Sequence, residues 1–132
     1  MGALDYKNHL QEDYLNYFGK ELKKVQNGEV DLKVLVSELK TIANNASIKH
    51  SETELFDYEQ VNTLITQSYY LLDNLEKYDE ETKNDVIAAI SYFVNEDDAI
   101  SDSDLLEGFD DDFAVMLAVV EYRGLGGPMI KK

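Results

Sequence analysis

Hydrophobic residues recur every three or four positions along most of the chain, a spacing that places them on one face of an α-helix. The first such stretch covers residues 4–27, and its apolar positions are Leu10, Tyr14, Phe18, Leu22 and Val25. Asn27-Gly28 is a typical end for such a helix. A second helix is predicted over residues 31–46, with Asp31 as its N-cap.

Residues 48–51 are predicted to connect the second helix to a third. Ser51 and Glu54 have the spacing of a capping box, and Asp57 offers a slightly later start. The hydrophobic pattern then continues to about residue 78.

The most apolar stretches lie in the last third of the chain. A helix is predicted over residues 80–95 after a candidate cap at Asp79, and its nearly unbroken apolar run at residues 86–94 predicts a central, buried helix. A last helix is predicted from residues 110–112 to Arg123, with Gly124 as its stop. The two helices should form a hairpin joined by an acidic loop.

These patterns predict an all-α, single-domain bundle of about five helices over residues 1–124. Residues 125–132 contain Gly126-Gly127-Pro128 and are predicted to form a flexible tail. At 132 residues and 44% hydrophobic content, the chain is large and apolar enough to bury a core.

Composition excludes several kinds of chemistry. The chain has no cysteine, which rules out disulfides and zinc sites built on cysteine. No window approaches 18 uninterrupted apolar residues, and the first residues lack a signal-peptide pattern. We therefore expect a cytoplasmic protein that does not enter the membrane.

The net charge of −15 is unevenly distributed. Residues 1–95 hold 17 acidic and nine basic residues, whereas residues 96–112 hold nine acidic residues and no basic one. Such a charge disfavours direct binding to nucleic acid or anionic membranes and favours a basic protein partner or metal cations.

Around the acidic stretch, aromatic residues and a glycine occupy fixed offsets. Over residues 86–122 the chain resembles the YkvA-like family, a bacterial domain of unknown function. The residues that carry the resemblance are Tyr92, Phe93, Asp98, Ile100, Asp102, Gly108, Phe109, Asp111 and Asp112. Since the family has no settled activity, the resemblance implies a helical fold more than a function.

Three roles are open to these carboxylates. They can cap helices and close turns, because a helix start offers unpaired N–H groups and a positive dipole end. They can hold Ca²⁺ or Mg²⁺, which prefer several oxygen ligands, although the spacing is not that of an EF-hand. The candidate metal ligands are Asp98, Asp102, Asp111 and Asp112.

The third role is to contact a basic protein. The carboxylates outside the family-like spacing are the candidates for it, namely Asp97, Asp104, Glu107 and Asp110. Electrostatic complementarity would speed association and favour one partner over others.

Catalysis has no comparable support. His9 and His50 lie on separate segments without an evident partner, and no phosphate loop or nucleophile motif is present. We therefore expect a non-enzymatic interaction or regulatory protein, such as an immunity protein, antitoxin or inhibitor, that binds a basic partner and needs no cofactor. The alternative is a helical domain that binds a divalent cation through the loop aspartates. The oligomeric state stays open.

The two hypotheses differ in their response to metal. If the aspartates bind a cation, Ca²⁺, Mg²⁺ or Mn²⁺ should release or absorb heat in a calorimetric titration and raise the melting temperature, since a ligand of the native state stabilises it. The absence of both effects would eliminate the cation hypothesis.

Overall fold

The computed structural model describes residues 6, 8, 10–52, 58–96 and 110–130, and within them every regular element is a helix. The predicted all-α bundle is confirmed. No helix in this part of the chain is long and apolar enough to cross a membrane. The elements are α1 (Glu12–Gln26), α2 (Leu32–Glu52), α3 (Tyr58–Asp73), the short 3-10 helix η2 (Leu75–Lys77), α4 (Glu80–Glu96) and α6 (Asp110–Arg123).

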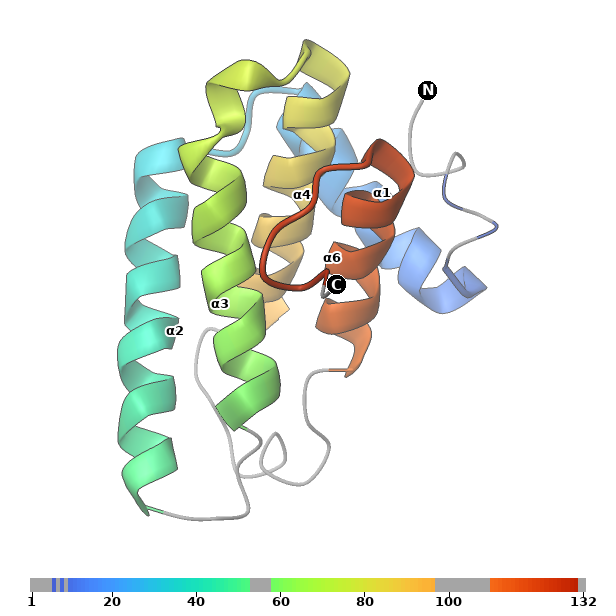
Figure 1. Cartoon of the computed structure of the whole chain (residues 1–132). Coiled ribbons are helices and arrows are strands. Elements are labelled where there is room, and N and C mark those ends of the chain that lie inside the picture. The colour runs from blue at the N-terminus through green and yellow to red at the C-terminus, as the bar shows by residue number, and fades with distance from the viewer. Residues whose placement is uncertain (1–5, 7, 9, 53–57, 97–109, 131–132) are drawn as a thin grey trace.

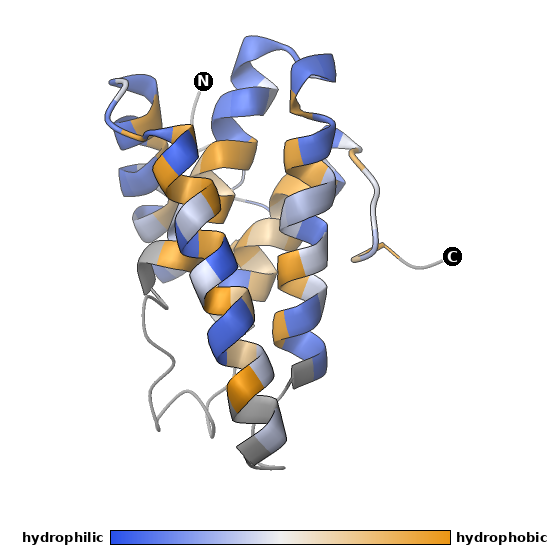
Figure 2. Ribbon diagram, turned by 90° about the vertical axis from the view of Figure 1, so that its left-hand side faces the viewer, coloured by the Kyte–Doolittle hydropathy of each residue, from blue (hydrophilic) through white to orange (hydrophobic). Residues whose placement is uncertain are grey.

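Helix α4 lies at the centre of the bundle, as its apolar run predicts. It contacts α1, α2 and α6, while α3 closes the bundle by contacting α2 and α6 (Figure 1). Hydrophobic stripes run along the helices and polar residues dominate several of their ends (Figure 2). The fully buried side chains of α4 include Val86, Ala88, Ile90, Phe93 and Val94.

Local capping interactions fix the starts of two helices where the sequence predicts them. The Asp31 carboxylate accepts a 2.9 Å hydrogen bond from the Lys33 N–H at the start of α2. At the start of α4, Asp79 accepts one of 2.9 Å from the Thr82 N–H. Hydrogen bonds from Thr82 lower the pKa of Asp79, since they stabilise the charged form.

The turn between α1 and α2 is fixed by Gly28, which has a φ of +75°. The Glu29 N–H donates to the Lys24 carbonyl at 2.9 Å, and the Gly28 N–H donates to the Val25 carbonyl at 3.0 Å. This is a Schellman motif, which needs a left-handed residue and therefore favours glycine. The motif reverses the chain and directs the residues after it toward α2.

The start of α1 and the end of α2 differ from those predicted. Helix α1 begins at Glu12, and Tyr6 lies in a separate turn closed by a 2.9 Å bond from the Leu10 N–H to the Tyr6 carbonyl. Helix α2 continues through the predicted connection at residues 48–51, and the Ser51 hydroxyl bonds the Ile48 carbonyl within it. Ser51 therefore does not start a new helix.

The third predicted helix is interrupted near its end. Helix α3 stops at Asp73, and η2 follows it after Asn74. The Asn74 side-chain amide donates a 2.8 Å hydrogen bond to the Tyr70 carbonyl. A side chain that bonds a terminal carbonyl competes with continuation of the helix, which accounts for the break.

The segment after α6 packs against α3 rather than extending away from the bundle as a flexible tail. The buried Gln67 side chain donates to the Gly126 carbonyl at 2.8 Å and accepts from the Met129 N–H at 2.9 Å. Met129 is buried too. Gln67 on α3 thus satisfies two backbone groups of this segment, and Figure 1 shows the chain turning back beside the helix.

Gly127 makes this packing possible. Its φ is +115°, and a Cβ atom there would lie 2.5 Å from Oε1 of Gln67. Gly124 also has a positive φ, but nothing lies within 4 Å of the position of its Cβ. Alanine in place of Gly124 would therefore meet backbone strain alone, whereas alanine in place of Gly127 would also clash with Gln67.

We expect Gly127→Ala to detach the segment from Gln67, whereas Gly124→Ala adds only left-handed strain of about 1–2 kcal/mol. The Met129 amide should lose its protection against hydrogen exchange in Gly127→Ala and keep it in Gly124→Ala. Equal protection in both variants would contradict the role assigned to Gly127.

Candidate functional site

A buried polar network joins three segments that are distant in sequence. The Tyr6 hydroxyl donates a 2.5 Å hydrogen bond to Oδ2 of Asp85 on α4. Arg123, the last residue of α6, donates to the same oxygen from Nε at 2.9 Å and forms an ion pair with it through Nη2 at 2.8 Å. Tyr6 is 0% exposed and Asp85 is 4% exposed, so the network lies inside the bundle.

Aromatic rings surround the phenol of Tyr6. The Phe18 ring on α1 meets it edge-on, with centroids 5.3 Å apart, and the Tyr122 ring on α6 lies 4.8 Å away. The Arg123 guanidinium lies over the Tyr122 ring at 5.2 Å. The burial of Tyr6 and Phe18 shields the bond between Tyr6 and Asp85 from water and strengthens it, whereas Tyr122 and part of Arg123 reach solvent.

The network changes the proton affinity of two of its members. Burial raises the pKa of Tyr6 well above its usual range, and the hydrogen bond to the Asp85 carboxylate raises it further. Burial alone would lower the pKa of Arg123, but its hydrogen bonds and charge interactions with Asp85 and Tyr6 together outweigh this effect and raise the pKa. Tyr6 is therefore a hydrogen-bond donor and Arg123 a cation at ordinary pH, which suits a structural clamp.

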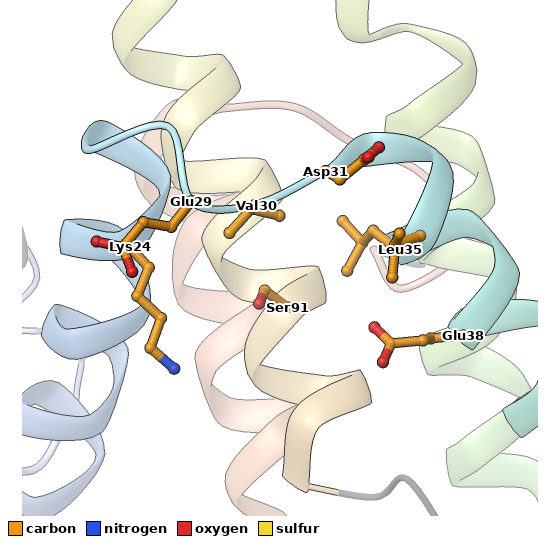
Figure 3. Close-up of a pocket in the computed structure, with 8 residues that line it drawn as sticks. Lys24, Glu29, Val30, Asp31, Leu35, Glu38 and Ser91 are labelled. Atoms are coloured by element: carbon orange, nitrogen blue, oxygen red, sulfur yellow. The ribbon is translucent and has the colours of Figure 1, made fainter.

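A second polar feature is a groove between α1 and α2. It encloses about 270 Å³, and α4 forms its floor (Figure 3). Helices α1 and α2 form its two sides, and the turn that joins them completes the lining. The lining residues are Lys24, Glu29, Val30, Asp31, Val34, Leu35, Glu38 and Ser91.

The floor of the groove is fixed by a buried carboxylate. The Ser91 hydroxyl on α4 donates a 2.8 Å hydrogen bond to Oε1 of Glu21 on α1. Lys24, one turn further along α1, lies 3.3 Å from the other oxygen of Glu21. These bonds couple α1 to α4 and hold the Lys24 ammonium beside Glu21.

Carboxylates surround the opening of the groove. Asp31 caps α2, and Glu29 accepts a long hydrogen bond of 3.4 Å from the Asn27 side chain. Glu38, one turn below Val34 on α2, points into the groove toward the α4 floor (Figure 3). The lining therefore combines three carboxylates, one lysine and three aliphatic side chains.

The structure reaches only part of the acidic stretch. The candidates Asp97, Asp98, Asp102, Asp104 and Glu107 lie outside the described residues, as does the predicted acidic loop. Asp110, Asp111 and Asp112 are the first three residues of α6, where the sequence predicts the helix start. The proposed partner-binding and metal-binding sets stay predictions.

Asp112 is the one predicted ligand whose side chain the structure describes, and it is 2% exposed. A carboxylate in the first turn of a helix interacts favourably with the helix dipole. Within the described residues no group of three or more acidic or histidine side chains is arranged to hold a metal ion. The position of Asp112 favours the structural role among those considered for these aspartates.

Sequence patterns did not reveal the Tyr6, Asp85 and Arg123 network. One signal was available: Asp85 immediately precedes the apolar run of α4, on a helix predicted to be buried. A buried carboxylate needs a cationic or hydrogen-bonding partner. The partner's identity depends on a contact across 38 residues for Arg123 and 79 for Tyr6.

Comparison with known proteins gives no match to a family model, a curated protein or a solved structure. The resemblance of residues 86–122 to the YkvA-like family therefore stays a prediction, and the candidate sites are judged by their geometry.

We expect Tyr6→Phe to lower the free energy of unfolding by about 1.5–3 kcal/mol at pH 7, because the hydrogen bond it removes has a charged acceptor. The raised pKa of Tyr6 stabilises the fold fully below pH 10. That contribution is lost as pH rises above the ordinary tyrosine value of about 10, since the unfolded chain then releases the proton first.

Urea denaturation at pH 8 to 11 measures this difference. The wild type should lose stability more steeply above pH 10 than Tyr6→Phe does, so that their stabilities converge. Parallel pH profiles would contradict the placement of Tyr6 in a buried network. Tyr17→Phe is a matched control because Tyr17 is exposed.

Proposed function

We propose that this chain is a non-enzymatic interaction protein whose acidic surface binds a basic protein partner, as an immunity protein, antitoxin or inhibitor does. The observation that carries the proposal is the way the chain uses its few cations. Both ion pairs between described residues, Lys24 with Glu21 and Arg123 with Asp85, involve carboxylates in the interior.

The solvent-exposed carboxylates, by contrast, are not paired with a lysine or arginine in the described part of the chain. Within the described residues the exposed acidic side chains form no ion pairs with the chain's own lysines or arginine. They lie on α1, in the α1–α2 turn, on α3, in and after η2, at the start of α4 and on α6. These residues are Glu12, Asp13, Glu29, Asp31, Glu59, Asp73, Glu76, Asp79, Glu80 and Glu121. In the described part of the chain these carboxylates are thus exposed to solvent without an ion-pair partner.

Such a surface selects its partner by charge. Like charges repel nucleic acid and anionic lipid, whereas a basic protein is attracted over distances of about one Debye length, or roughly 8 Å at physiological ionic strength. A partner that carries a basic site for nucleic acid fits this chemistry, because the acidic surface would occupy that site. The resemblance to the YkvA-like family adds a bacterial setting to the proposal, and the absence of cysteine fits a cytoplasmic one.

Tyr6 and Arg123, whose pKa values are raised, are bonded to the same buried carboxylate of Asp85. Shifted pKa values in a cleft mark candidate catalytic groups, but the Tyr6 hydroxyl is buried and bonded inside the bundle, which supports a structural role for it. Divalent-cation binding stays the alternative, and its case depends on aspartates outside the described residues.

We expect the immobilised protein to capture a basic protein from its native host at low salt. Calorimetry with the purified partner should show defined stoichiometry, and affinity should fall by about tenfold or more between 0.1 and 0.5 M NaCl, because salt screens charge attraction. Capture of acidic partners alone, or binding that salt leaves unchanged, would argue against the proposal.

A further inference from the structure

The groove between α1 and α2 exposes apolar surface beside unneutralised charge. Val34 is 53% exposed, although it adjoins Leu35, whose side chain belongs to the core. Val30 is partly buried and faces the same space (Figure 3). Three aliphatic side chains therefore line a hollow that the described residues of the chain do not fill.

Glu38 supplies the charge in this hollow. Its carboxylate points into the groove (Figure 3). Within the part of the chain that the structure describes, it makes no hydrogen bond or ion pair. It is only half-exposed. Lys24, on the opposite wall, is held by Glu21 and does not neutralise Glu38.

The size of the groove limits its occupant. Its volume of about 270 Å³ lies below the roughly 300–1,000 Å³ that is usual for small-molecule sites. A single long side chain presented by another protein fits the combination of small volume, aliphatic walls and carboxylates. Lysine and arginine have this form, because an apolar stem carries a charged end.

We propose that the groove is the docking site for a lysine or arginine of the basic partner, with its stem on Val34 and Leu35 and its cation at Glu38. The proposal rests on the proposed function and names the place and the chemistry of contact. Apolar residues beside the cationic one in the partner would cover Val30 and the exposed part of Val34.

The groove is preorganised for this contact. The Schellman motif at Gly28 and the cap at Asp31 fix the turn that carries Glu29 and Val30. The bond between Ser91 and Glu21 fixes the floor relative to α1. A preformed site spends less binding energy on ordering its own side chains.

Two synthetic peptides of equal positive charge test the proposal. One alternates lysine or arginine with leucine, and the other replaces each leucine with serine. We expect the leucine peptide to bind the full chain more tightly in fluorescence anisotropy at 0.15 M NaCl. In ¹⁵N-labelled protein it should shift the amide resonances of Val30, Val34, Leu35 and Ser91.

Matched variants identify the contribution of the groove. Glu38→Gln should weaken binding of the leucine peptide by about three- to fivefold, as expected for a partly exposed ion pair. Val34→Ser should weaken it by about threefold through lost apolar contact. Glu81→Gln makes the same charge change on α4, at a carboxylate that is half-buried like Glu38 but lies outside the groove lining, and should change affinity by less than about twofold.

The outcomes separate this inference from the proposed function. If both peptides bind equally, the shifts map outside the groove and Glu38→Gln matches Glu81→Gln, the groove proposal is overturned while charge-driven binding stands. If neither peptide binds at 0.15 M NaCl, both proposals fail. Thermal melting of each variant confirms that a loss of binding does not reflect unfolding.

Discussion

The buried Asp85 carboxylate is the constraint on which the arrangement of this bundle depends. It lies on the central helix, where an unpaired charge would cost several kcal/mol. Tyr6 and Arg123 both bond its Oδ2 atom, and they come from opposite ends of the described chain. Apolar packing permits many relative rotations of helices, whereas this shared acceptor fixes α6 and the segment before α1 against α4.

Hydrophobic spacing predicted the helices of the described residues because each one buries a face with a regular period. It located the ends of helices where capping is local, as at Asp31, Asp79 and Gly28. It failed where a distant contact decides the conformation. Gln67 on α3 holds the backbone of residues 126–129, which composition alone presents as a tail. At Ser51 the competing contact is local, because its hydroxyl bonds the Ile48 carbonyl within α2.

The groove escaped prediction for a related reason. Its carboxylates, Glu29, Asp31 and Glu38, do not form a run, and its floor residue Ser91 is more than 50 positions away from them. The sequence instead draws attention to residues 96–112, where acidic residues are adjacent. Density of charge along a chain and convergence of charge in space are different properties, and only the folded bundle reveals the second.

Gln67 and Asp85 also govern the order in which the protein can be completed during synthesis. Tyr6 emerges from the ribosome early, but Arg123, its companion on Asp85, is translated more than a hundred residues later. Gln67 likewise waits for Met129. Helices α1 to α4 can form and associate beforehand, yet the Asp85 carboxylate and the Gln67 amide lack part of their native partners until residues 123–129 have been translated. The nascent chain therefore completes the polar contacts of Asp85 and Gln67 late, whereas the bond between Ser91 and Glu21 that couples α1 to α4 can form earlier.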